Sequence, residues 1–213
     1  MSVLVLVDIQ NDFLPGGSLA VSQGEKILPV VNKLLTLPFD SIIATKDWHP
    51  KSHQSFAANH CAEPGQIIIL RGLEQILWPV HCVQDTYGAE LSKELNLQRI
   101  DKIIYKGTDE SVDSYSTFFD NGHFKSTGLD KYLREQHLEE VYIAGLATDY
   151  CVKYSALDAL KLGYKTYVVI DACQGVNLNP NDSREALDKI KEAGGVLITS
   201  QEVTKKIGRG SGL

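Results

Sequence analysis

A cysteine stands at the point where a predicted strand gives way to a predicted helix. Cys151 closes the segment Gly-Leu-Ala-Thr-Asp-Tyr-Cys, which follows a β-rich run over 141–144 and precedes a helical pattern over 152–160. Backbone N–H groups at a helix start are unpaired, so we expect Thr148 or Asp149 to cap the helix. Because the helix dipole is positive there, we also expect the pKa of the Cys151 thiol to be lowered. The same N–H groups can stabilise a tetrahedral oxyanion. The alternative is a buried cysteine that only packs against the sheet.

An acid and a base follow two other predicted strands. Asp8 ends the apolar run over 3–7, and Lys106 ends the run over 102–105. A carboxylate beside a thiol can take its proton, and a lysine beside both can hold the carboxylate and stabilise the developing charge. The alternative is an ion pair with a purely structural role. With Cys151, these two residues predict nucleophilic hydrolysis.

Three further residues have the chemistry of metal ligands. Asp47 and His49 follow the strand predicted over 41–45 and are two residues apart, so their side chains share a face. His81, in a later irregular stretch, is the third candidate. Three protein ligands leave positions open for water or substrate, as catalytic metal sites require. Nitrogen and carboxylate donors favour zinc, with iron or manganese as alternatives.

The other histidines carry a weaker signal. We expect His53 and His60 to be ordinary hydrogen-bonded histidines, with His53 the better candidate for an extra ligand. A structural zinc site is also conceivable from two adjacent His-Cys pairs. We disfavour it, because adjacent side chains tend to point apart and the spacing fits no familiar zinc pattern. Its four residues would be His60, Cys61, His81 and Cys82.

The order of the predicted elements explains why the chemical residues should meet. Strands and helices alternate, which predicts a single-domain, doubly wound α/β fold: a mainly parallel sheet with helices on both faces, over residues 1–207. Ligands bind such sheets outside the carboxyl ends of the strands, where Asp171 would also lie at the end of the run 166–170. The remaining segments are strands over 41–45 and 196–199, a helix opened by a capping box at 22–25, a helix capped by 182–185, a helix opened by 127–130, a long excursion over 49–98 and a mobile tail over 208–213.

Composition excludes several other classes of protein. The chain of 213 residues is 43% hydrophobic and carries a net charge of -6, so we expect no nucleic-acid partner. No apolar run has membrane-spanning length and the N-terminus lacks a basic signal region, which predicts a cytoplasmic protein with no membrane partner. The four cysteines are expected to be free thiols. The sequence is compatible with a monomer or a homo-oligomer.

Five motifs, in this order and at this spacing, resemble the nicotinamidase/pyrazinamidase family of isochorismatase-like hydrolases. The likeness runs from residue 3 to roughly residue 178. The motifs are Val-Asp8-Ile-Gln-Asn-Asp12-Phe13, Asp47-Trp-His49-Pro-x-x-His53-x-Ser-Phe56, Trp78-Pro-x-His81-Cys82, Lys106-Gly107 and Gly145-Leu-Ala-Thr-Asp-Tyr-Cys151-Val.

The resemblance implies specific roles for these residues. Asp8, Lys106 and Cys151 match the family's catalytic triad, and Asp47, His49 and His81 match its metal ligands. A cis peptide is implied between Leu146 and Ala147, aiming the Ala147 and Cys151 N–H groups at the oxyanion. The metal would contact the pyridine nitrogen of the substrate. The pocket residues would be Phe13 and Trp78 around the ring, with Leu146, Tyr115 and Tyr150 lining the rest.

The implied reaction is hydrolysis of nicotinamide to nicotinate and ammonia through a Cys151 thioester, with a role in NAD salvage and pyrazinamide also accepted. Three alternatives remain at this point. One is a relative acting on a carbamoyl or other linear amide, which would lack the metal ligands. Another is a vinyl-ether hydrolase, which needs no nucleophilic cysteine. The last is a binding module without catalysis, which the intact Asp8, Lys106 and Cys151 disfavour.

Overall fold

A six-stranded parallel sheet forms the centre of the protein. The computed structural model describes residues 1–208, and its sheet has the strand order β5-β2-β1-β6-β7-β8. All neighbouring strands run parallel, as predicted from the alternation of strands and helices. The strands are β1 (Ser2–Val7), β2 (Ser41–Asp47), β5 (Lys102–Lys106), β6 (Glu140–Leu146), β7 (Lys165–Gln174) and β8 (Val196–Ile198).

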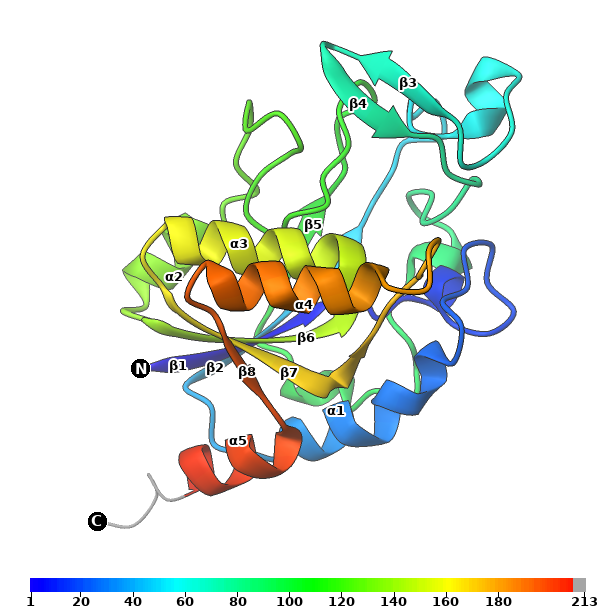
Figure 1. Cartoon of the computed structure of the whole chain (residues 1–213). Coiled ribbons are helices and arrows are strands. Elements are labelled where there is room, and N and C mark those ends of the chain that lie inside the picture. The colour runs from blue at the N-terminus through cyan, green and yellow to red at the C-terminus, as the bar shows by residue number, and fades with distance from the viewer. Residues whose placement is uncertain (209–213) are drawn as a thin grey trace.

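Helices cover both faces of this sheet, which confirms the doubly wound fold (Figure 1). Alternate residues of β1 enter two separate cores: Leu4 and Leu6 pack with α1 and α5, whereas Val3 and Val5 pack with α2, α3 and α4. β1 is therefore apolar and buried from residue 3 to residue 7, as expected for a strand buried on both sides. The helices are α1 (Leu28–Leu34), α2 (Leu129–Glu135), α3 (Lys153–Lys161), α4 (Asp182–Glu192) and α5 (Ser200–Ile207).

The predicted excursion over 49–98 contains a hairpin that the sequence pattern did not reveal. β3 (Ile67–Leu70) and β4 (Leu73–Ile76) pair antiparallel and project beyond the sheet (Figure 1). Two isolated bridges, His49 with Val83 and Phe56 with Trp78, tie the two arms of the excursion together. Since an isolated hairpin is marginally stable, these ties hold it over the end of the sheet.

Two predicted helix caps, the capping box at 22–25 and the cap at 182–185, are wrong. The 3₁₀ turn Gly24–Ile27 follows Gln23, which is in the left-handed region and makes no side-chain cap. α4 likewise begins after Asn181 without a side-chain cap. The carboxylate of Asp182 instead accepts a hydrogen bond from the N–H of Asn179. A capping box does occur at Thr199, before α5, a helix that was not predicted. The pattern alone does not show which polar side chains are already engaged elsewhere.

Asp171 is also misplaced in the prediction. β7 continues to Gln174, so Asp171 lies within the strand. Its carboxylate accepts hydrogen bonds from the N–H and the hydroxyl of Ser200, at 2.7 and 2.6 Å. Asp171 therefore holds the start of α5 and does not belong to the group of predicted catalytic and metal-binding residues.

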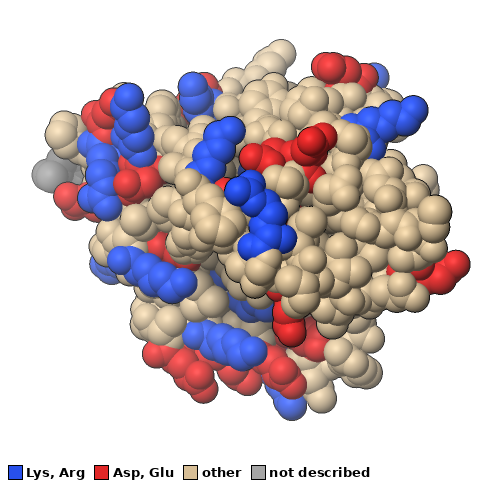
Figure 2. All heavy atoms as spheres, turned by 90° about the horizontal axis from the view of Figure 1, so that it is seen from above, with Lys and Arg blue, Asp and Glu red and all other residues tan. Residues whose placement is uncertain are grey.

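The remaining global features concern the surface and the chain ends. Acidic and basic side chains are interspersed over the face seen in Figure 2. Among residues 1–208, no helix is both long and apolar enough to cross a bilayer. The assignment of 1–207 to one domain stays a prediction. The predicted mobile tail, apart from Gly208 at the end of α5, lies outside the described residues.

Candidate active site

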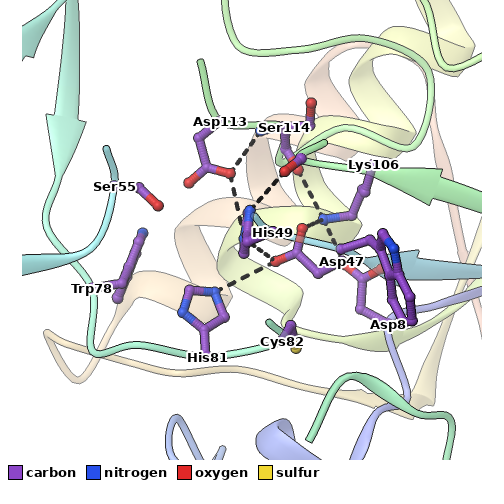
Figure 3. A network of polar contacts seen from close by, with 12 residues as sticks. Asp8, Asp47, His49, Ser55, Trp78, His81, Cys82, Lys106, Asp113 and Ser114 are labelled. Carbon is purple, nitrogen blue, oxygen red and sulfur yellow. Dashed lines mark hydrogen bonds and ion pairs between the residues drawn. The ribbon is translucent and has the colours of Figure 1, made fainter. Parts of the chain in front are cut away.

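The ends of four neighbouring strands bring the predicted catalytic and metal-binding residues together. Strands β5, β2, β1 and β6 are adjacent in the sheet, and Asp47 pairs in register with Lys106. Asp8 follows β1, and the segment after β6 leads to Cys151. The close-up in Figure 3 shows Asp8, Lys106 and Asp47 beside one another at this edge, with His49 and His81 next to Asp47.

Lys106 is the centre of the polar network. Its Nζ lies 2.9 Å from Asp8 Oδ2 and 3.0 Å from Asp47 Oδ1, donates to the Ser114 carbonyl at 2.8 Å and reaches Cys151 Sγ at 3.5 Å. The side chain is fully buried. Burial alone lowers the pKa of Lys106, but the carboxylates of Asp47 and Asp8 raise it well above its usual value. The ammonium group is therefore charged and offsets two buried carboxylates.

The surroundings of Cys151 shift its pKa in the direction opposite to the prediction of a lowered thiol pKa. Burial raises the pKa of Cys151 well above its usual value, and the charge of Lys106 offsets this only in part, because Asp8 and Asp47 also raise it. The residue sits in a π-helical turn, Thr148–Val152, rather than in a regular first turn. A neighbouring base is needed to generate the nucleophile.

The cap of this turn also differs from the prediction. Ala147 precedes it, and its carbonyl accepts from the N–H groups of both Tyr150 and Val152. Asp149 is not a cap: its carboxylate accepts from the N–H groups of Val176 and Asn177, at 2.9 and 2.7 Å. The peptide between Leu146 and Ala147 is cis, as the resemblance implied.

Asp8 has the environment of a proton acceptor. Thr45 donates its hydroxyl proton to Asp8 Oδ1 at 2.6 Å, and the backbone of Asp8 adopts a φ of 49°. Burial raises the pKa of Asp8 despite the opposing charge of Lys106. A carboxyl group with a raised pKa beside a thiol is suited to exchange a proton with it.

The predicted metal ligands form one cluster with their donor atoms correctly oriented. Asp47 Oδ2 lies 3.0 Å from His49 Nε2 and 3.5 Å from His81 Nε2. On the far side of each ring, Nδ1 meets a backbone carbonyl: Gly107 for His49 at 2.9 Å, and Pro79 for His81 at 2.7 Å. A carbonyl only accepts, so each Nδ1 carries a proton, and Nε2, which faces the Asp47 carboxylate, is the ring nitrogen through which each histidine would bind a metal ion. These three donors fit a divalent metal ion.

Gly107 is required by this arrangement. Its φ of 64° is in the left-handed region, and a Cβ there would lie 2.4 Å from Cε1 of the His49 ring and 2.9 Å from Asp47 Oδ1. The glycine after Lys106 therefore lets two metal ligands approach the backbone of β5.

Sequence reasoning missed Asp113, Ser114 and Ser55. Asp113 is buried, with Oδ1 3.9 Å from His49 Nε2, and forms a second possible ligand group with His49 and His53. Ser114 supplies the carbonyl that holds Lys106, and Ser55 bonds to His53. Ser55 stands in one of the family motifs but was given no role there, and Asp113 and Ser114 follow no predicted strand, so no signal marked those two. Neither group of possible metal ligands within residues 1–208 includes Cys61 or Cys82, so the structural zinc alternative finds no support.

Aromatic side chains form a wall beside this cluster. Trp78 Nε1 donates to the Tyr115 hydroxyl at 3.0 Å, and Tyr150 packs edge-on against both rings. Phe13 lies against the ring of His81, with 5.6 Å between centroids. Leu146 is buried at the end of β6 and packs in the same core cluster as Phe13. These are the residues that the resemblance assigned to the substrate pocket.

Comparison with known proteins gives a consistent result. Residues 2–202 match the model of the Isochorismatase domain family. The nicotinamidase of Escherichia coli is 47% identical over 92% of this chain and 93% of its own length. A solved nicotinamidase/pyrazinamidase from Acinetobacter baumanii has a TM-score of 0.91 at 44% identity, covering 95% of this chain and 97% of the other. A pyrazinamidase from Pyrococcus horikoshii in complex with zinc has a TM-score of 0.76 at 38% identity, covering 93% and 98%.

Proposed function

This chain belongs to the nicotinamidase/pyrazinamidase family within the isochorismatase family, and from that premise we propose that its site hydrolyses nicotinamide to nicotinate and ammonia. The chain is an amidohydrolase of this family. The observation that carries the proposal is the contact of one buried lysine with Asp8, Asp47 and Cys151, beside an oriented set of metal ligands.

In the proposed mechanism Asp8 acts first as a base. It takes the proton of Cys151, and the thiolate attacks the amide carbon, forming a C–S bond. The N–H groups of Ala147 and Cys151 stabilise the oxyanion, and Lys106 balances the negative charge. The C–N bond breaks as Asp8 returns the proton to nitrogen, so ammonia leaves. Water then hydrolyses the thioester, which releases nicotinate and restores the thiol.

Asp47, His49 and His81 would hold the metal, for which we propose zinc, with iron or manganese as alternatives. When bound, the ion would take the ring nitrogen of the substrate as a ligand and so orient the pyridine ring. The support from this chain is that backbone carbonyls hold both Nδ1 atoms, which leaves both Nε2 atoms directed at Asp47. Phe13 and Trp78 would sandwich the ring, and the side chains of Leu146, Tyr115 and Tyr150 would line the pocket.

The wider assignments are proposals as well. We propose a cytoplasmic enzyme of NAD salvage that also accepts pyrazinamide, with a small-molecule substrate and neither nucleic-acid nor membrane partners. Acceptance of pyrazinamide is supported by a relative, since the nicotinamidase/pyrazinamidase of Mycobacterium tuberculosis is 33% identical over 94% of this chain. Both a monomer and a homo-oligomer are compatible with the proposal.

The decisive experiment is ammonia release from nicotinamide by the wild type and by Cys151→Ala, each with and without a metal chelator. We expect turnover in the wild type, loss of turnover in the variant, and a reduced rate after chelation that zinc restores. Turnover of a vinyl ether that persists in the Cys151→Ala variant, without ammonia release from nicotinamide, would favour a vinyl-ether hydrolase. Turnover of a carbamoyl substrate alone would favour a linear-amide hydrolase. A folded, zinc-loaded wild type without turnover on any of these would leave a binding module.

A further inference from the structure

His53 lies beside the metal site but is held differently from the two histidines in the ligand cluster. Its side chain is fully buried, and its ring centroid is 4.2 Å from that of His49. The two rings of the ligand cluster, His49 and His81, each direct Nδ1 at a backbone carbonyl. His53 instead directs Nδ1 at Ser55, 3.1 Å from its backbone nitrogen and 2.7 Å from its hydroxyl oxygen.

This contact determines where the proton of His53 resides. A backbone N–H can only donate, so Nδ1 of His53 must accept the hydrogen bond from Ser55. The hydroxyl of Ser55 then donates to the same nitrogen. A neutral ring whose Nδ1 accepts carries its proton on Nε2, and a doubly protonated ring is excluded by the same contact. His53 therefore presents an N–H donor beside the metal site, whereas His49 and His81 direct Nε2 at the Asp47 carboxylate.

The Nε2 atom of His53 has no hydrogen-bond partner among the described residues. The ligand atoms of His53, His49 and Asp113 all lie within 4.8 Å of one another. Two hydrogen bonds of about 2.8 Å meeting at one water span such a gap. Asp113 is fixed as the acceptor, because Oδ1 accepts from the N–H of Ser114 at 2.7 Å and Oδ2 from the amide of Gln75 at 3.3 Å.

We propose that His53 is a positioning residue that donates a hydrogen bond at the metal centre and is not itself a metal ligand. Its Nε2–H and the Asp113 carboxylate hold a water molecule between them, next to Nε2 of His49. The protein then supplies the ion with three ligands, Asp47, His49 and His81, and keeps the remaining positions for substrate and solvent. The inference rests on the proposed function only for the presence of the metal.

Long-range ¹H–¹⁵N correlation spectra of the histidine rings test the proposal directly, in zinc-free and in zinc-loaded protein. His53→Phe, which removes one ring from the spectrum, assigns the His53 signals. We expect His53 to keep its proton on Nε2 in both states, while zinc shifts the Nε2 signals of His49 and His81. Loss of the His53 Nε2 proton on zinc binding, or a proton on Nδ1 without zinc, would overturn the proposal.

Zinc affinity, measured by competition with a chelator, gives a second test that needs no turnover. His53→Gln keeps a donor near the Nε2 position, so we expect less than about a tenfold loss of zinc affinity, whereas His53→Phe should lose roughly 10- to 100-fold, as is usual for outer hydrogen-bonding partners. The ligand variant His81→Gln should lose more than either. Equal losses in His53→Gln and His81→Gln would refute the donor role. Failure of the wild type to bind zinc would instead reject the proposed metal centre, and the zinc-free spectrum would still decide the state of His53.

Discussion

Replacing Thr45 by valine tests whether Asp8 is the catalytic base. The Thr45 hydroxyl donates to Asp8 Oδ1 at 2.6 Å and also accepts from the Asp8 N–H at 3.2 Å. Valine fills nearly the same volume in this fully buried position but cannot donate. Thr45 is one of the groups that hold the pKa of Asp8 down, against the burial that raises it. The substitution should therefore raise the pKa of Asp8 further.

The expected size follows from the strength of the lost bond. A hydrogen bond to a charged group contributes about 1.5–3 kcal/mol, and about 1.4 kcal/mol corresponds to one pKa unit. Part of the bond persists in the protonated acid, so we expect an increase of roughly one unit. A base must be ionised to act, so activity is lost as the pH falls through its pKa. The acidic limb of the rate profile should move to higher pH by this amount.

The assay is kcat/KM for nicotinamide as a function of pH, because this ratio reports the ionisation of the free enzyme. Thr166→Val is the matched control: Thr166 is equally buried, on β7, and its hydroxyl donates to the Tyr164 carbonyl. We expect its acidic limb to coincide with that of the wild type. An unshifted limb in a folded Thr45→Val protein, or a shift to lower pH, would show that Asp8 is not the group that controls activity.

Further variants test the charge balance, the backbone and the pocket. Lys106→Met should abolish turnover and lower the free energy of unfolding by about 3–5 kcal/mol in urea titrations, because it leaves buried carboxylates unpaired. Lys46→Met is the control, because the carboxylate partner of Lys46 is half exposed, and it should lower the free energy of unfolding by about 1 kcal/mol. Equal losses of stability in the two variants would contradict the argument from buried charge. Gly107→Ala should lower the zinc content of purified protein, since the new Cβ meets a ligand ring at 2.4 Å; Gly163→Ala has a similar positive φ but open space, so it should keep its zinc. Gln75→Leu removes the amide that donates to the hydroxyl of Tyr115 at 3.2 Å. It should raise KM for nicotinamide about fivefold with a smaller change in kcat. An unchanged KM would show that this amide has no part in substrate binding.

Much of the fold could be predicted because strands and helices here follow local patterns. The apolar run of β1 and the helical spacing around Val31 and Leu34 reflect burial that the observed layers confirm. Once the strands are parallel, their carboxyl ends must meet at one edge. The proximity of Asp8, Asp47 and Lys106 follows from this rule, and the structure places all three there.

Capping signals were less reliable, because a local pattern does not show what else a side chain contacts. From the sequence, Asp171 was expected to end a strand and Asp182 to cap a helix. In the folded chain they are engaged by Ser200 and Asn179 respectively. Similarly, Asp113 and Ser114 lie in a segment without regular structure, so no periodicity pointed to them.

The sequence by itself determined the chemical groups, the parallel sheet and the edge at which those groups collect. Only the tertiary structure decided their protonation. Burial and the carboxylates of Asp8 and Asp47 raise the Cys151 pKa, and Lys106 lowers it, so the groups that shift it come from β1, β2 and β5. The ring of His49 is likewise oriented by a distant group, the carbonyl of Gly107, whereas that of His53 is oriented by the N–H of Ser55 in its own segment. Electrostatics and hydrogen bonding act through space, so residues distant in the chain determine what each local motif can do.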